Sequence, residues 1–123
     1  MAKEKIMVVD DEEDVTFLLS SLLEFHDFSV KIHNDSKGVM VDLEGGGYSL
    51  MVTDYMMPGL DGLHLCEHIR ASQKTNQMKI VMLTAKELTP LEHKRLLELN
   101  VTIVKKPYQP NELVTRIREL MQR

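Results

Sequence analysis

Short apolar runs alternate with longer amphipathic stretches along this chain. The runs predict strands near residues 5–10, 28–33, 49–54, 78–83 and 101–105. Met51-Val52 and the run from Ile80 to Leu83 are apolar at consecutive positions, which is typical of strands covered on both faces. Because each strand is followed by a stretch of helical pattern, we expect five strand-helix units.

The first helix is predicted from apolar residues at helical spacing behind an acidic start. Its apolar positions are Val15, Leu18, Leu19, Leu22 and Leu23. The acidic run 12–14 precedes them, where the helix dipole favours anions.

Turn and cap residues predict the other four helices. Ser36 is expected to cap a short second helix that the Gly45-Gly46-Gly47 run ends, and Asp61 to cap the third. The fourth is expected from about residue 87 to residue 99, and Pro110 falls in the first turn of the fifth. The apolar positions expected on these helices are Val39, Leu43, Leu65, Cys66, Ile69, Leu113, Ile117 and Leu120.

Five alternating units predict an α/β fold with a doubly wound parallel sheet. Parallel strands need crossover connections, which are right-handed and place helices on both faces. The 123 residues suit one domain, 1–123. In such sheets, ligands bind outside the carboxyl ends of the strands.

Composition excludes several classes of protein. The net charge of −4 without a long basic run argues against a nucleic-acid surface. No apolar stretch reaches the roughly 18–20 residues of a membrane span, and no signal-peptide core follows the N-terminus. The lone Cys66 excludes an internal disulfide and favours a cytoplasmic location.

Charged and hydroxyl side chains follow four of the predicted strands. They are Asp10, Asp11, Asp54, Thr84 and Lys106. Two unit charges about 4 Å apart repel by roughly 4 kcal/mol at an effective dielectric near 20, so clustered carboxylates call for retained protons or a divalent cation. Oxygen ligands suit Mg²⁺, for which Mn²⁺ can substitute.

These groups have the chemistry of a metal-dependent phosphoryl-acceptor site. Asp54 ends a strand of its own and is assigned as the nucleophile, while Asp10 and Asp11 hold the metal. Lys106 supplies a positive charge, and Thr84 a hydroxyl donor to a phosphoryl oxygen.

Four motifs in order resemble the receiver domain of two-component response regulators over essentially the whole chain. They are Val8-Val9-Asp10-Asp11, Asp54-Tyr55-Met56-Met57-Pro58-Gly59-Leu60-Asp61-Gly62, Leu83-Thr84-Ala85 and Lys106-Pro107. The resemblance implies a flavodoxin-like sheet of strand order 2-1-3-4-5. It also implies a signalling module that catalyses only its own phosphorylation and dephosphorylation.

The resemblance assigns roles to individual residues. Asp54 accepts a phosphoryl group from a phosphohistidine of a sensor histidine kinase, from a phosphotransfer protein or from a small phosphodonor. Mg²⁺ is held by Asp10, Asp11 and Asp54 and by the backbone carbonyl of Met56. Thr84 is the switch hydroxyl and Lys106 the phosphate-contacting lysine, since Lys105 lies one place too early.

One position departs from the family pattern. The family usually has Tyr or Phe three residues before the lysine, and this chain has Ile103. Tyr108 does not replace that ring. The resemblance implies a downstream protein partner at the surface of the fourth helix, fifth strand and fifth helix, and a monomer or a phosphorylation-linked dimer.

Two positions are expected to tune the lifetime of the phosphoryl group. In the family, residues two after the acceptor and two after the switch threonine flank the path of the hydrolytic water. Here they are Met56 and Lys86. An apolar Met56 cannot orient water, so we expect no unusually fast autodephosphorylation.

Simpler interpretations remain at each position. Asp10 and Asp11 can be helix caps, Thr84 an N-cap and Lys106 a surface cation. The glycine run precedes a strand, which favours a turn over a phosphate loop. His64 and His68 lie four apart on one predicted helix without an evident third metal ligand.

Two other functions compete with the phosphorylated switch. In an Asp-nucleophile phosphatase a second acid stands two places after the nucleophile. Met56 cannot serve Asp54 in that way, whereas Glu12 stands two places after Asp10. A receiver-like interaction domain that is never phosphorylated is the second alternative, and Ile103 is its only support.

Overall fold

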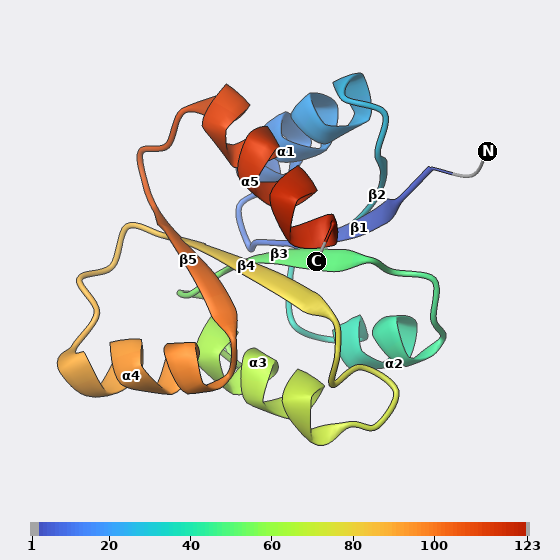
Figure 1. The fold of residues 1–123 in the computed structure, drawn as a ribbon. Helices are drawn as coiled ribbons and strands as arrows, with labels where there is room; N and C mark the ends of the chain where they lie inside the picture. Colours follow the sequence, from blue (N-terminus) through green and yellow to red (C-terminus); the bar gives the residue numbers. More distant parts are fainter. Residues whose placement is uncertain (1–2, 123) are drawn as a thin grey trace.

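A computed structural model describes residues 3–122 of the chain. Five strands and five helices alternate along it (Figure 1). Their bounds are β1 Lys5–Val9, α1 Glu13–Phe25, β2 Ser29–His33, α2 Val39–Glu44, β3 Leu50–Asp54, α3 Gly62–Ala71, β4 Lys79–Thr84, α4 Pro90–Glu98, β5 Val101–Lys105 and α5 Pro110–Met121. Among these residues no helix is both long and apolar enough to cross a bilayer.

The five strands form one parallel sheet of order β2-β1-β3-β4-β5. Figure 1 shows α1 and α5 on one face, with α2, α3 and α4 on the other. The doubly wound α/β fold and its strand order are therefore confirmed. Since all strands run in the same direction, their carboxyl ends share one edge of the sheet.

Two hydrophobic cores lie on the two faces of the sheet. Successive strand residues point to opposite faces, so Ile6 and Val8 pack under α1 and α5, whereas Met7 packs under the other three helices. Burying one side chain of this size contributes about 1.5–3 kcal/mol relative to leaving it exposed. Both faces of β1, β3 and β4 are thus covered, which explains their continuous apolar runs.

Local chemistry sets where two helices begin. Asp61 caps α3, as predicted, by accepting a hydrogen bond from the backbone N–H of His64. Thr89 and Glu92 form a capping box at the start of α4, with Pro90 as its first residue. The fourth helix therefore begins at Pro90 and not near residue 87.

Two further expectations about the helices are wrong. Ser36 does not cap α2, because Gly38 occupies the N-cap position with φ of 76° and no side chain caps that end. The turn that a glycine permits there decides where the helix begins. Leu18 is not on the buried face of α1, since 67% of it is exposed.

Candidate functional site

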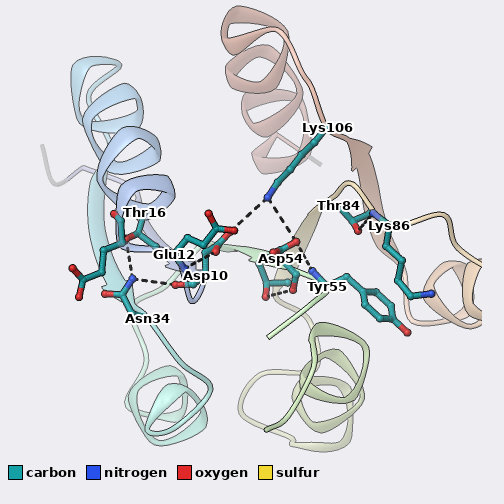
Figure 2. A network of polar contacts seen from close by, with 11 residues as sticks. Asp10, Glu12, Thr16, Asn34, Asp54, Tyr55, Thr84, Lys86 and Lys106 are labelled. Atoms are coloured by element: carbon teal, nitrogen blue, oxygen red, sulfur yellow. Dashed lines mark hydrogen bonds and ion pairs between the residues drawn. The ribbon is translucent and has the colours of Figure 1, made fainter. Parts of the chain in front are cut away.

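Two carboxylates and one ammonium group meet at the carboxyl edge of the sheet. Asp10 follows β1, Asp54 ends β3, and Lys106 follows β5. The Lys106 Nζ lies 3.7 Å from Asp10 Oδ2 and 3.7 Å from Asp54 Oδ1. Figure 2 shows the Lys106 side chain reaching between the two acids. The topology therefore brings together residues that lie far apart in the sequence.

Backbone and side-chain hydrogen bonds hold Asp10 in place. Its Oδ1 accepts a bond of 3.0 Å from the backbone N–H of Glu12. The Asn34 side-chain amide donates to the Asp10 backbone carbonyl at 3.0 Å and to the Thr16 hydroxyl at 2.9 Å. Sequence reasoning missed Asn34, although its position directly after β2, at this same edge, was a usable signal.

Asp54 is held by the chain that follows it. Its Oδ1 accepts a bond of 2.8 Å from the backbone N–H of Tyr55. Gly62, the first residue of α3, donates its N–H to the Tyr55 carbonyl at 2.8 Å. A Cβ at position 62 would overlap the Asp54 carbonyl oxygen, so only glycine allows α3 to start this close to β3.

The electrostatics of the edge favour a bound cation. Burial raises the pKa of Asp10 above its usual value, and the charges of Asp54 and Asp11 raise it further. The Glu12 backbone N–H and Lys106 lower that pKa and only partly offset these effects. A divalent cation would remove this mutual repulsion between carboxylates.

The donor set fits a hard divalent cation. Carboxylate oxygens of Asp10, Asp11 and Glu12 lie within 4.8 Å of one another, and Asp11 and Glu12 are exposed. Oxygen ligands on an open face suit Mg²⁺, which keeps several waters. Glu12 was predicted at the acidic start of the first helix and not as a metal ligand, and it is the N-cap residue of α1.

A cavity of about 430 Å³ opens beside Asp11 and Met56, two of the predicted metal ligands. Met56 is 62% exposed, and its side chain lines this cavity. Lys86 lines it too, as do Tyr55, Met57, Pro58 and Asp61. The two positions expected to flank the hydrolytic water therefore border one opening.

Thr84 ends β4 and is buried at the same edge. Its hydroxyl accepts a bond of 3.0 Å from the backbone N–H of Lys86, and its carbonyl accepts one of 3.0 Å from the backbone N–H of Lys106. The hydroxyl proton is left for another acceptor. Ile103 and Thr84 line a second cavity of about 440 Å³ between the start of α4 and β5.

Several simpler interpretations do not hold. The N-cap of α1 is Glu12, without a side-chain cap, so neither Asp10 nor Asp11 caps that helix. Thr84 is a strand residue, and α4 is capped by Thr89. His64 bonds to Asp61, and among residues 3–122 the histidines belong to no group of three metal-binding side chains.

The family profile described as response regulator receiver domain matches residues 6–118. The transcriptional regulatory protein YkoG of Bacillus subtilis is 37% identical over 120 residues, covering 96% of this chain and 51% of the relative. CpxR of Escherichia coli K12 is 35% identical over 120 residues, covering 97% and 50%. The chain thus spans about half the length of the curated relatives it matches.

Solved structures agree with this match. The BeF3-activated N-terminal receiver domain of Klebsiella pneumoniae RstA has a TM-score of 0.86 and 27% identity, covering 98% of this chain and 100% of that one. A CheY-like receiver domain protein from Methanospirillum hungatei JF-1 has a TM-score of 0.89 and 22% identity, covering 98% and 94%. The second likeness concerns the fold alone.

Proposed function

The chain belongs to the response regulator receiver domain family, and from that premise we propose that Asp54 is its phosphoryl acceptor. Receiver domains are phosphorylation-switched signalling modules whose partners are histidine kinases or phosphotransfer proteins, and they bind Mg²⁺ in an acidic pocket. We assign the entire chain, residues 1–123, to this one domain.

Asp10, Asp11, Asp54 and the backbone carbonyl of Met56 would hold the Mg²⁺ ion. When bound, the ion neutralises charge on the phosphoryl oxygens and on the carboxylates around them. The burial of Asp10 and the exposure of Asp11 support a site with one side anchored in protein and the other open to water and donor.

Asp54 acts as the nucleophile. One of its carboxylate oxygens forms a bond to phosphorus as the bond from phosphorus to the donor's imidazole nitrogen breaks. The electron pair of the broken bond stays on the imidazole. The Tyr55 N–H, which donates to Asp54 Oδ1, orients the carboxylate for this attack.

Lys106 and Thr84 complete the site. In the free protein the Lys106 ammonium group lies between Asp10 and Asp54. When Asp54 is loaded with a phosphoryl group, the ammonium group pairs with one oxygen of that group, and the Thr84 hydroxyl donates to another of its oxygens. The protein thereby catalyses only its own phosphorylation and, with water as the acceptor, its own dephosphorylation.

The phosphoryl group on Asp54 should be lost at an ordinary rate. Met56 has no polar atom to orient water, and the Lys86 ammonium group is paired with Glu92 at 2.7 Å. Met56→Asn should therefore speed the decay of the aspartyl phosphate, because an amide can bind the attacking water. The decay is followed by intact mass after the donor is removed, and unchanged or slower decay would contradict this role.

The phosphorylation signal passes to a downstream protein that binds the surface formed by α4, β5 and α5. Ile103 stands on β5 within that surface and keeps the family's aromatic switch from operating in its usual form. The protein acts as a monomer or as a phosphorylation-linked dimer. A cytoplasmic setting is supported by the buried free thiol of Cys66 and by the kinases that serve this family.

The placement of Lys106 between Asp10 and Asp54 carries the proposal most directly. We expect acetyl phosphate with Mg²⁺ to add the mass of one phosphoryl group to the protein, and expect chelation of the metal to abolish it. Asp54→Asn should prevent the addition. Asp27→Asn is a matched control, because that exposed residue has φ of 70°, which asparagine readily adopts. Equal phosphorylation of both variants would overturn the assignment.

A further inference from the structure

The carboxylate of Glu92, in the first turn of α4, receives hydrogen bonds from two loops of the site. The Tyr55 hydroxyl donates to Oε2 at 2.6 Å, and the Lys86 ammonium group donates to Oε1 at 2.7 Å. The Thr89 backbone N–H also donates to Oε1, at 2.9 Å, as part of the capping box. We call Tyr55, Lys86 and Glu92 the Glu92 clamp.

The two donor residues of the clamp, Tyr55 and Lys86, lie close in sequence to Asp54 and Thr84. Tyr55 directly follows Asp54, and its N–H holds the Asp54 carboxylate. The backbone N–H of Lys86 holds the Thr84 hydroxyl. Figure 2 shows the Tyr55 ring and the Lys86 side chain both extending away from Asp54, whereas Lys106 points toward it. The clamp thus joins the ends of β3 and β4 to the start of α4.

The carboxylate of Glu92, which the other two members of the clamp contact, is ionised. Hydrogen bonds from Lys86 and Tyr55, with that from the Thr89 N–H, lower the pKa of Glu92 to about 2. The Lys86 ammonium group also lies 5.2 Å from the centroid of the Tyr55 ring, within range of a cation-π contact. At neutral pH all three members therefore hold one another in place.

Helix capping explains only part of this arrangement. A capping box needs one glutamate oxygen for the Thr89 N–H and leaves the other free. Here the second oxygen accepts the Tyr55 hydroxyl, a contact between residues 37 apart in sequence. At the same time, the aliphatic Ile103 on β5 has no ring that could turn inward, so transmission to α4 needs another route.

We propose that the Glu92 clamp couples the loading of Asp54 to the position of the first turn of α4. This inference rests on the proposed function. When the Thr84 hydroxyl turns to donate to a transferred phosphoryl group, the Lys86 backbone bonded to it shifts as well. That shift pulls the Lys86 ammonium group against Glu92, and Tyr55 anchors the same carboxylate to the acceptor strand. Tyr55 and Glu92 act as positioning residues.

The proposal implies that the clamp opposes loading. Because it is complete in the unloaded protein and strained in the loaded one, its removal should tighten the binding of fluoroberyllate, used with Mg²⁺ as the phosphoryl mimic. Tyr55→Phe, which removes only the hydroxyl, and Glu92→Gln should each lower the dissociation constant of fluoroberyllate by about fivefold. The change in amide-exchange protection of α4 on loading should fall to about half, as expected when two sites lose part of their coupling.

Two matched controls separate coupling from ordinary stabilisation. Tyr48→Phe removes a comparable hydroxyl-carboxylate bond, to Asp42 at 2.9 Å, and Tyr48 precedes β3 whereas Asp54 ends that strand. Glu67→Gln breaks a different ion pair of α4, from Arg95 to Glu67 at 3.0 Å, which ties that helix to α3 and not to the site. Both controls should bind fluoroberyllate as the wild type does and keep the full response of α4.

The outcomes are distinct. Wild-type affinity and a full α4 response in Tyr55→Phe and Glu92→Gln would overturn the coupling while leaving the proposed function intact. An equal effect of Glu67→Gln would also overturn it, since any weakening of α4 would then suffice. Failure of the wild type both to bind fluoroberyllate and to accept a phosphoryl group would refute the proposed function, and the coupling with it.

Discussion

Removal of the Lys106 charge should destabilise the protein in the absence of a divalent cation. Lys106→Met keeps the length and much of the apolar volume of the side chain but removes the ammonium group between Asp10 and Asp54. Asp10 is 3% exposed at its side chain, Asp54 12% and Lys106 24%. Two carboxylates with little access to water would be left without their shared counter-charge.

The geometry gives the size of the effect. A unit charge pair at 3.7 Å has a Coulomb energy of about 4.5 kcal/mol at an effective dielectric of 20, and Lys106 makes two such pairs. Most of this is offset by the desolvation of the three charged groups, so the net contribution is far smaller. We expect Lys106→Met to lower the free energy of unfolding by about 2 kcal/mol.

Urea denaturation with and without Mg²⁺ measures this effect. Millimolar Mg²⁺ should restore part of the lost stability, because the metal supplies positive charge to the same carboxylates and binds the folded state. Lys105→Met is the matched control. Lys105 is exposed, forms no ion pair among residues 3–122, and should change stability by less than about 0.5 kcal/mol.

Two results would refute this reasoning. One is a Lys106→Met variant as stable as the Lys105→Met control in metal-free buffer. The other is a loss of stability that Mg²⁺ leaves undiminished, since the lysine would then stabilise the fold by packing and not by neutralising the carboxylates.

Other predictions concern the close contacts and the core of the molecule. Gly62→Ala should lower the free energy of unfolding by about 1–3 kcal/mol and slow phosphorylation, since the added Cβ overlaps the Asp54 carbonyl oxygen. Gly59→Ala, at φ of +80° with open space around it, should cost about 1 kcal/mol without slowing phosphorylation. Burial raises the pKa of Cys66 to about 12, so alkylation at pH 8 should be about a thousandfold slower than that of a free thiol and should speed up in urea. Fast alkylation of the folded protein would contradict the buried position of Cys66.

Hydrophobic periodicity was sufficient to predict a doubly wound parallel sheet, whereas the strand order was predicted from the family resemblance. Consecutive apolar residues in β3 and β4 indicated strands covered on both faces, and alternation with helices then required a parallel sheet. The prediction was weakest where a single turn residue decides where a helix begins. Gly38, at positive φ, and not Ser36, sets the start of α2, and no apolar pattern reveals which of two neighbouring turn residues will prevail.

The edge of the sheet on which the candidate residues lie was predictable from the sequence, but the contacts among them were not. Strand ends placed Asp10, Asp54, Thr84 and Lys106 at one edge because topology alone determines that edge. The bond from Tyr55 to Glu92 was not predictable, since it depends on how far α4 lies from β3.

Arg70 illustrates the same difficulty. Its guanidinium donates to the carbonyls of Leu99 at 2.7 Å and Met78 at 2.6 Å, joining two connections that no local motif relates. Contacts of this kind are set by the packing of helices on the sheet, and a single sequence carries no periodic signal for them.

Chemical trapping of the loaded protein tests the central claim most directly. Treatment with acetyl phosphate and Mg²⁺, followed by borohydride, reduces an aspartyl phosphate to homoserine, which peptide mapping then locates. The account predicts homoserine at position 54 alone, formed only when Mg²⁺ is present. Homoserine at position 10 or 11, or none at any aspartate despite a working donor, would contradict it.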